Sequence, residues 1–198
     1  MALVDVKEAA SSVADLIART AKALRDTAGE LEQGALVEPV EFVIPMADLG
    51  TERMAGHCRR ILDGVGRKQL GVYIIDLDAD VPLCRVHDII GKLKAANVAL
   101  PKNDRTGFAK VNKREDCEGS RCLYVGKSEK TAERLKEHLH YVHPTTYALH
   151  LNRWPSDIPG NLIVKVIGVK DIASSLVTFI EDQVARDTPP ILGKRGSV

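Results

Sequence analysis

The 198-residue sequence has no run of about 18 apolar residues or more, so no segment is typical of a membrane-spanning helix. Its N-terminus carries acidic side chains early and lacks the basic leader and apolar stretch of a secretory signal. Its four cysteines, in a chain of this size, favour reduced thiols over a disulfide scaffold. We therefore expect a cytoplasmic protein with no membrane partner.

A glycine-rich phosphate loop before a helix is also missing, which leaves nucleotide hydrolysis without support. The sequence contains no internal repeat and no low-complexity segment. What is present is ordinary for a globular protein, with 44% hydrophobic and 28% charged residues. A chain of this length is sufficient for one well-packed domain with extensions.

The net charge of +1 conceals an uneven distribution of charge along the chain. Residues 1–33 carry four basic and six acidic side chains, whereas residues 92–114 carry seven basic side chains and one acidic. A local basic stretch of this kind neutralises nucleic-acid phosphates, and a solvated lysine-rich loop has the same composition. The sequence leaves both interpretations open.

The spacing of apolar residues predicts alternating helices and strands. Residues 4–33 favour an amphipathic helix that packs on the following domain or pairs with a second copy. We expect Gly126 to end a strand and Ser128 to cap the next helix. The remaining predicted strands and helices, in chain order, are strand 40–44, helix 50–62, strand 70–77, helix 86–96, strand 122–125, helix 128–141, strand 162–169 and a helix that follows Asp171 and ends before Pro189.

Two tyrosines are the first candidates for chemistry. Tyr73 and Tyr124 each lie beside a glycine in a predicted strand, where a tyrosine is usually a core or edge residue. A phenol with a pKa of about 10 is a poor base near neutral pH unless a nearby cation lowers that pKa. Lys127 and Arg134 are the candidate cations.

Three further side chains follow on predicted helices. Arg134 and His138 are four residues apart and therefore share one helix face. Glu181 interrupts an apolar helix face, and it is either an ordinary exposed glutamate or a metal ligand. One carboxylate is sufficient for Mg²⁺, because water and substrate phosphate complete its coordination.

These residues follow one another in a recognisable order: Gly71-Val72-Tyr73, Tyr124-Val125-Gly126, Arg134, His138 and Glu181. The order and intervals resemble the GIY-YIG nuclease family over about residues 68–195. The resemblance implies an α/β fold with a small, mostly antiparallel three-stranded sheet flanked by helices. It places a nuclease domain at residues 67–198, with an insert at about 78–121, after an N-terminal helical extension at residues 1–66.

The resemblance also implies the activity, a divalent-metal-dependent hydrolysis of DNA phosphodiester bonds with Mg²⁺ (or Mn²⁺) held by Glu181. Tyr73 takes a proton from the attacking water with help from a cation, Lys127 or Arg134. Arg134 stabilises the charge that grows on the phosphoryl oxygens, while Tyr124 and His138 orient water or phosphate. A restriction or defence enzyme is the leading interpretation, and cutting both strands with one small site favours a homodimer. The alternatives are a structure-specific or mobile-element nuclease and a catalytically silent nucleic-acid-binding module.

Two departures from the family pattern concern DNA contacts. About fifty residues separate the two tyrosine motifs, a long interval similar to that of some restriction endonucleases of the family, in which inserts help to recognise DNA. An asparagine is missing from the C-terminal tail, and two basic residues take its place as candidate phosphate contacts. The candidate DNA-binding residues are Lys102, Arg105, Lys110, Lys113, Arg114, Lys194 and Arg195.

A zinc site is a further possibility, formed by Cys84, His87, Cys117 and Cys122. Their spacing fits no common zinc finger, and buried free cysteines are the favoured interpretation. The remaining histidines near the second motif have no other metal-ligating residues at a suitable spacing. We expect ordinary surface or helix-end residues at His140, His143 and His150.

Overall fold

The structure is a computed structural model of the chain, which describes residues 18–19, 21–22, 25–26, 28–29, 37–140, 147–170, 172 and 174–193. The chain divides into two compact units, Met1–Leu36 and Val37–Val198. In the first unit the described residues are helical, in agreement with the helix predicted there, and the rest of that predicted helix lies outside the described residues. Residues 37–66, predicted as part of the N-terminal extension, belong to the second unit.

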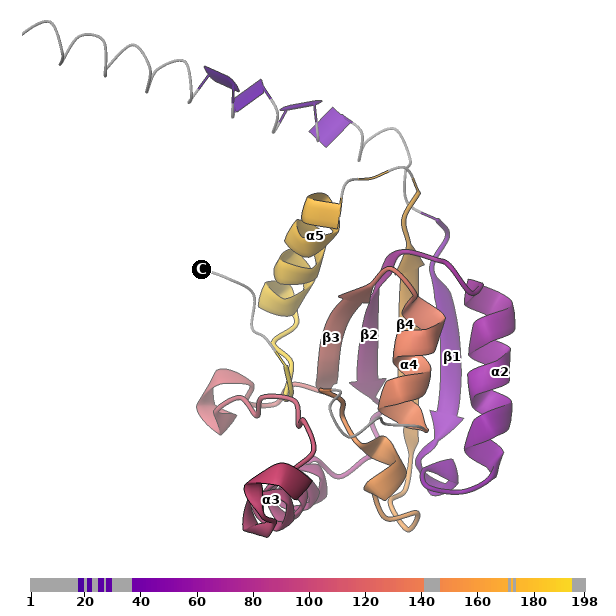
Figure 1. The fold of residues 1–198 in the computed structure, drawn as a ribbon, viewed down its shortest axis with the longest axis vertical. Coiled ribbons are helices and arrows are strands. Elements are labelled where there is room, and N and C mark those ends of the chain that lie inside the picture. The colour runs from indigo at the N-terminus through magenta and orange to yellow at the C-terminus, as the bar shows by residue number, and fades with distance from the viewer. Residues whose placement is uncertain are drawn as a thin grey trace, which may run out of the picture. The chain divides into compact units, whose positions relative to one another are not determined.

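Four strands form one sheet in the second unit, in the order β1-β4-β2-β3, and every neighbouring pair is antiparallel (Figure 1). The strands are β1 (Val40–Pro45), β2 (Gly71–Leu77), β3 (Cys122–Ser128) and β4 (Asn161–Gly168). The α/β class is confirmed, but the expected number of three strands is wrong. The fourth strand is β1, which pairs with β4 along its whole length and packs Phe42 against α2 at Gly64.

The second unit also contains helices, which are α2 (Arg53–Val65), α3 (Leu83–Ala99), α4 (Thr131–Leu139) and α5 (Ser174–Asp187). Three of them, α2, α4 and α5, pack beside the sheet (Figure 1). Helix α2 contacts α4, and it buries Met54, Cys58 and Ile61 at helical spacing. Helix α5 contacts β3 and β2. Among the helices of the described residues, none combines the length and apolar composition that a membrane span requires.

The link between β3 and α4 differs from the prediction. Strand β3 continues through Gly126 to Ser128, so the prediction that Gly126 ends this strand is wrong. Helix α4 begins at Thr131, and Ser128 is not its N-cap. Instead, the Ser128 hydroxyl accepts a hydrogen bond from the Lys130 N–H at 3.0 Å and closes the turn before the helix.

The C-terminal segment connects the insert to the sheet. Ile191 and Leu192 donate backbone hydrogen bonds to β3, each at 2.9 Å. On the other side of the segment, the Asn112 N–H donates to the Ile191 carbonyl at 3.0 Å, and the Gly193 N–H donates to the Lys110 carbonyl at 2.7 Å. Residues 110–112 of the insert are therefore fixed to the edge of β3 through the end of the chain.

Candidate active site

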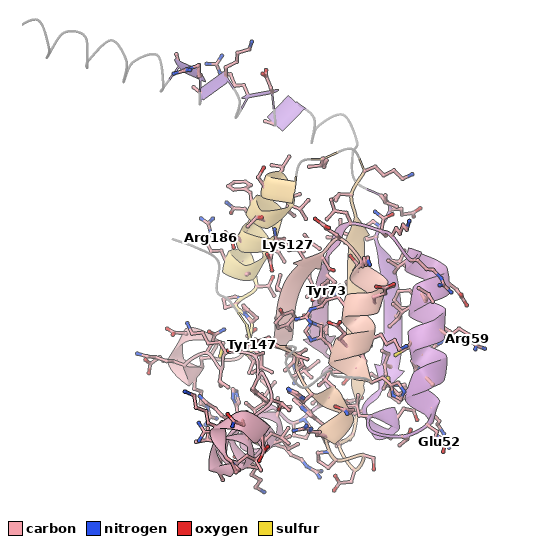
Figure 2. All side chains as sticks on the ribbon, viewed as in Figure 1. Glu52, Arg59, Tyr73, Lys127, Tyr147 and Arg186 are labelled. Atoms are coloured by element: carbon pink, nitrogen blue, oxygen red, sulfur yellow. The ribbon has the colours of Figure 1, made fainter. Side chains whose placement is uncertain are left out.

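The pairing of β2 with β3 brings the two motif tyrosines together. Figure 2 labels one of them, Tyr73. Tyr73 lies opposite Gly126, and its ring stacks on that of Tyr124 with centroids 6.0 Å apart and planes at 29°. A Cβ atom at Gly126 would lie 2.6 Å from the Tyr73 hydroxyl oxygen and 2.6 Å from Tyr124 Cε1. Gly193, with φ of 101°, makes a similar approach to the other side of the Tyr124 ring. Glycine at these two positions leaves room for the stacked phenols.

His138 of α4 is completely buried, and its ring centroid lies 5.8 Å from that of Tyr73 and 4.9 Å from that of Tyr124. Its Nδ1 lies 3.3 Å from the backbone N–H of Leu149, which can only donate, so Nδ1 accepts. The neutral ring therefore carries its proton on Nε2 and donates it to the Tyr73 hydroxyl oxygen at 2.9 Å. Burial, followed by the positive charge of Arg134, lowers the pKa of His138 well below its usual value, so the ring stays neutral.

Arg134 supplies the cation of the site. Its guanidinium donates hydrogen bonds to the Glu137 carboxylate and to the backbone carbonyl of Tyr147. Burial alone would lower the pKa of Arg134, but the hydrogen bond to Glu137 and the nearby phenols raise it. Burial raises the pKa of both Tyr73 and Tyr124, and the guanidinium limits that increase through its charge and through hydrogen bonding.

The charge of Glu181 influences both phenols. Burial is the largest influence on both phenols, and it raises the pKa of Tyr124 and raises that of Tyr73 well above 10. The negative charge of Glu181 raises both values further. The carboxylate on α5 therefore acts on the two strand tyrosines, although 57 residues separate Tyr124 from Glu181 in the sequence.

Lys127 connects β3 to the helix that carries the carboxylate. Its ammonium donates a hydrogen bond to the hydroxyl of Thr178 on α5, three residues before Glu181. This contact lies one helical turn from Glu181 and fixes α5 to the edge of the sheet. Of the two cations considered from the sequence, Arg134 acts on the phenols by charge and hydrogen bond, and Lys127 holds α5.

The structure thus brings together four of the predicted site residues, Tyr73, Tyr124, Arg134 and His138, and the charge of a fifth, Glu181, acts on both phenols. The candidate DNA-binding residues in the insert are all exposed: Lys102, Arg105, Lys110, Lys113 and Arg114. Lys194 and Arg195 lie outside the described residues. Arg105 also has a structural role, because its guanidinium donates to the Val98 and Leu100 carbonyls at the end of α3, at 2.7 and 3.0 Å.

The proposed zinc ligands do not assemble. No group of three or more His, Cys, Asp or Glu side chains gathers at a metal-binding distance anywhere in the described residues. Cys84 is exposed, whereas Cys117 is buried and its thiol donates to the Lys113 carbonyl at 3.3 Å. Burial raises the pKa of the Cys122 thiol, which keeps it protonated and a poor ligand. Among the site candidates, only Glu181 and the two phenols offer oxygen atoms, the ligand type that a hard cation such as Mg²⁺ prefers.

The amino-acid sequence contains no sign of one segment that holds candidate site residues in place. Residues 147–150 hold the two candidate side chains of α4. The Tyr147 carbonyl accepts a hydrogen bond from Arg134, and the Leu149 N–H donates one to His138. The prediction that His150 is an ordinary surface or helix-end residue is wrong, since it is buried and stacks on Phe108 at 5.5 Å. Backbone contacts of this kind leave no signal in the sequence.

The fold and the site define an α/β protein with an antiparallel sheet and a polar cluster of phenol, imidazole and guanidinium groups between β2, β3 and α4. Comparisons of the chain with models of known protein families, with curated proteins and with solved structures find no match. The function is therefore inferred from the geometry and chemistry of this cluster.

The neutral state of His138 predicts a loss of stability in acid. Below about pH 6.5 the unfolded chain binds a proton that the folded chain excludes, so the free energy of unfolding falls as the pH falls. The loss approaches about 1.4 kcal/mol for each pH unit until the folded pKa is reached, and full stability returns above about pH 6.5. Urea denaturation at several pH values measures this slope.

His138→Gln is the matched variant, because its amide can donate to Tyr73 and accept from Leu149 but does not titrate. The acid-side slope of this variant should be smaller than that of the wild type by the contribution of one proton. Equal slopes in the two proteins would show that His138 is not held neutral.

Proposed function

We propose that this protein is a divalent-metal-dependent endonuclease that hydrolyses DNA phosphodiester bonds, of the restriction or defence type and acting as a homodimer. The observation that carries the proposal is the convergence of two phenols, a neutral imidazole, a guanidinium and a carboxylate from β2, β3, α4 and α5. Phosphodiester hydrolysis needs a proton acceptor, a cation for the phosphoryl charge and a carboxylate for a metal ion. The cluster supplies one group for each of these needs.

Glu181 is the residue that would hold Mg²⁺ or Mn²⁺, because these cations prefer oxygen ligands and one carboxylate is sufficient. Such a cation, when bound, polarises the phosphate as a Lewis acid. The Lys127–Thr178 hydrogen bond holds α5 against β3 and thereby keeps Glu181 close to the phenols. The protein's own contribution at this position is thus a fixed carboxylate at the edge of the sheet.

Tyr73 is the proposed base, and His138 favours its ionised form. A phenolate is stabilised by hydrogen bonds that it accepts, and the Nε2–H of His138 donates one to the Tyr73 oxygen. Only 1% of Tyr73 is exposed, whereas Tyr124 is half-buried and therefore lies nearer the substrate. Tyr124 accordingly orients the attacking water. It accepts the proton of the water as it passes its own hydroxyl proton to the phenolate of Tyr73, with which it shares a hydrogen bond.

Arg134 stabilises the charge that develops on the phosphoryl oxygens. Its contacts with Glu137 and with the Tyr147 carbonyl fix the guanidinium before substrate binds. A preorganised donor of this kind contributes about 10²- to 10³-fold to a reaction rate. The same charge opposes the increase that burial causes in the pKa of both phenols, and so enlarges the ionised fraction of Tyr73 that can accept a proton.

A nucleic-acid-binding module without catalytic activity is the second candidate. It is favoured by the deep burial of Tyr73 and by the raised pKa of both phenols, which keep them protonated at neutral pH in the absence of a further cation. The exposed basic side chains of the insert suit either function equally.

Digestion of a mixed-sequence plasmid separates the two candidates. With Mg²⁺ we expect cleavage to ends that carry a 5′-phosphate and a 3′-hydroxyl, and with EDTA we expect binding alone. The variant Glu181→Gln, purified in parallel, controls for contaminating nucleases. Binding without cleavage in both Mg²⁺ and Mn²⁺ would refute the enzyme and leave the binding module. Sequencing the ends shows whether the cuts fall at one recognition sequence.

A further inference from the structure

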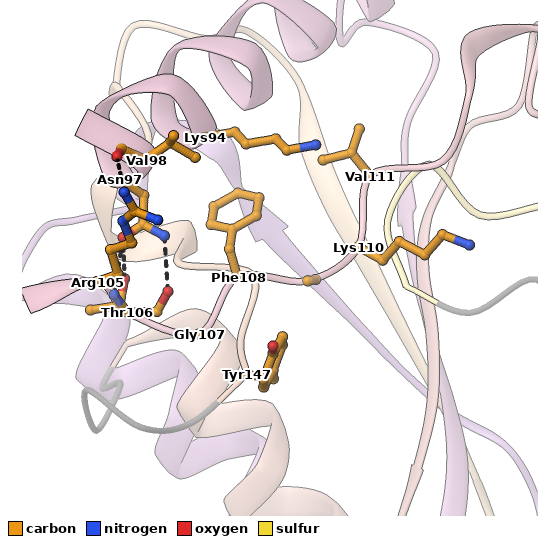
Figure 3. A pocket seen from close by; sticks show the side chains of 11 residues that line it. Lys94, Asn97, Val98, Arg105, Thr106, Gly107, Phe108, Lys110, Val111 and Tyr147 are labelled. Atoms are coloured by element: carbon orange, nitrogen blue, oxygen red, sulfur yellow. Dashed lines mark hydrogen bonds between the residues drawn. The ribbon is translucent and has the colours of Figure 1, made fainter. Parts of the chain in front are cut away.

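A cavity of about 680 Å³, open to solvent, lies between α3 and the segment of residues 105–111 (Figure 3). Three cationic side chains and two aromatic rings are among the residues that line it, and none of its lining residues is acidic: Lys94, Arg105, Lys110, Phe108 and Tyr147. We call this cavity the insert groove. Its volume lies within the range of about 300–1,000 Å³ that is typical of sites for small organic groups. Its charge is complementary to that of a nucleic-acid strand.

The frame of the insert groove is fixed by side-chain hydrogen bonds. Asn97 of α3 donates to the Thr106 carbonyl at 2.9 Å and accepts from the Thr106 N–H at 3.0 Å. Phe108 stacks on the buried ring of His150, with planes at 9°. His150 adopts a left-handed backbone conformation, with φ of 52°, and its Nε2 lies 2.7 Å from the Gly107 carbonyl. These contacts fix the position of the Phe108 ring in the lining of the insert groove.

The insert groove shares a segment of backbone with the candidate active site. Successive residues of the segment 147–150 contact the two sites in turn. Tyr147 and Leu149 contact α4, through Arg134 and His138 respectively. Of the other two, Ala148 exchanges backbone hydrogen bonds with residues 107 and 109, at 3.4 and 3.3 Å, and His150 contacts Gly107. The Tyr147 ring therefore lines the groove while its own carbonyl holds the catalytic arginine.

Tyr147 lacks the packing of an ordinary aromatic residue. It is 69% exposed, and Val98, also in the lining, is 54% exposed. An exposed ring beside cations is the arrangement on which single-stranded nucleic acids stack their bases. A base inside a duplex has both faces covered by its neighbours, so only a base that has left the stack can take this position.

We infer that the insert groove binds an unpaired nucleotide of the substrate, with its base stacked on Tyr147 and its phosphates close to Lys94 and Lys110. The inference rests on the proposed function and narrows its substrate to DNA that has, or is made to have, an unpaired nucleotide next to the cleaved bond. The nucleotide comes from a bulge, a single-stranded region or a base flipped out of the duplex.

Binding in EDTA tests this inference with three labelled DNAs: a paired duplex, the same duplex with one extra unpaired nucleotide, and the single strand. Fluorescence anisotropy should show that the wild type prefers the bulged duplex or the single strand to the paired duplex. Tyr147→Ala should weaken binding of the preferred DNA by about 5- to 100-fold and leave the paired duplex unaffected. Tyr147→Phe should keep the preference, because the stacking face is retained.

Phe179→Ala is the matched control, because Phe179 is an exposed ring, at 53%, that lies on α5 and outside the lining of the insert groove. Its preference for unpaired DNA should equal that of the wild type. Lys94→Gln supplies an independent measurement: the slope of log affinity against log salt should fall by about one if this ammonium contacts a phosphate. An unchanged slope would remove Lys94 from the site.

The three DNAs identify the source of the nucleotide. Binding of the bulged duplex above the single strand indicates a nucleotide displaced from a duplex, and the reverse order indicates a single-stranded substrate. The inference would be overturned if the wild type bound neither the bulged duplex nor the single strand more tightly than the paired duplex. It would also be overturned if Tyr147→Ala kept the wild-type preference for unpaired DNA.

The assay is independent of cleavage, so the two proposals fail separately. If the protein cuts paired DNA in Mg²⁺ but has no Tyr147-dependent preference for unpaired DNA, the proposed nuclease activity stands and the proposed nucleotide site is refuted. If the protein shows this preference but never cuts DNA, the insert groove stands as a nucleotide site and the proposed nuclease activity is refuted.

Discussion

Glu181→Gln lowers the rate of Mg²⁺-dependent DNA cleavage by about 10³-fold or more, while DNA binding in EDTA stays close to that of the wild type. Glutamine has the shape of glutamate but lacks the negative charge that a hard cation requires. The transition-state stabilisation supplied by a metal ion is several kcal/mol, and each 1.36 kcal/mol corresponds to about a tenfold change in rate.

The sign of this effect is informative, because the Glu181 charge raises the pKa of both phenols. If the carboxylate acted only through the phenols, its removal would lower both pKa values, and more phenolate would be present at neutral pH. Cleavage would then stay constant or increase. A large decrease therefore identifies Glu181 as a metal ligand.

Single-turnover cleavage at saturating DNA, measured over a series of Mg²⁺ concentrations, gives both the rate and the apparent metal affinity. Asp182→Asn removes the neighbouring carboxylate on the same helix and should leave both values unchanged. Thermal denaturation of the two variants checks that α5 remains folded. Wild-type cleavage by Glu181→Gln would refute both the metal site and the proposed mechanism.

Arg134→Lys lowers the cleavage rate by about 10²- to 10³-fold although it retains the positive charge. The guanidinium donates to the Glu137 carboxylate and to the Tyr147 carbonyl, and it also acts on both phenols by hydrogen bonding. An ammonium has a single nitrogen and cannot make these contacts together. The loss should appear in kcat, with little change in KM, because the charge on phosphate grows in the transition state.

The same substitution should also move the pH profile. A base must lose its proton before it acts, so the cleavage rate rises with pH. Burial raises the pKa of Tyr73 and Tyr124, and Arg134 limits that increase through its charge and its hydrogen bonds, of which lysine preserves the charge alone. The rising limb of the profile should therefore shift to higher pH in Arg134→Lys.

Arg186→Lys is the matched control, since Arg186 is exposed on α5 and the chemical change is identical. Its rate and pH profile should equal those of the wild type. If Arg134→Lys behaved in the same way as this control, Arg134 would contribute only its charge and would have no role in orienting phosphate.

Local patterns in the sequence were sufficient for most secondary structure. The apolar residues of β2 and β4 predicted both strands, and the helical spacing of Met54, Cys58 and Ile61 predicted α2 to within three residues at each end. These elements form where they do because the periodicity of the apolar side chains matches a strand or a helix that faces one core. The residue types of the candidate site were evident for the same reason, since each lies in a strongly patterned element.

Other features depend on partners that are distant in the sequence. Gly126 has the local character of a strand breaker, but it continues β3 because its missing side chain accommodates the rings of Tyr73 and Tyr124. His150 has the local character of a surface residue, but contacts with Gly107 and Phe108 bury it. A local pattern contains no information on which distant backbone or ring will lie alongside.

The order of the chemical groups and the strands and helices that carry them follow from the amino-acid sequence. Their protonation states do not, because burial and the charges of neighbouring groups, among them Arg134 and Glu181, together decide the pKa of each phenol. The neutral tautomer of His138 likewise depends on a backbone N–H eleven residues away. Electrostatic interactions act through space, so the tertiary structure alone determines whether these groups form a working site.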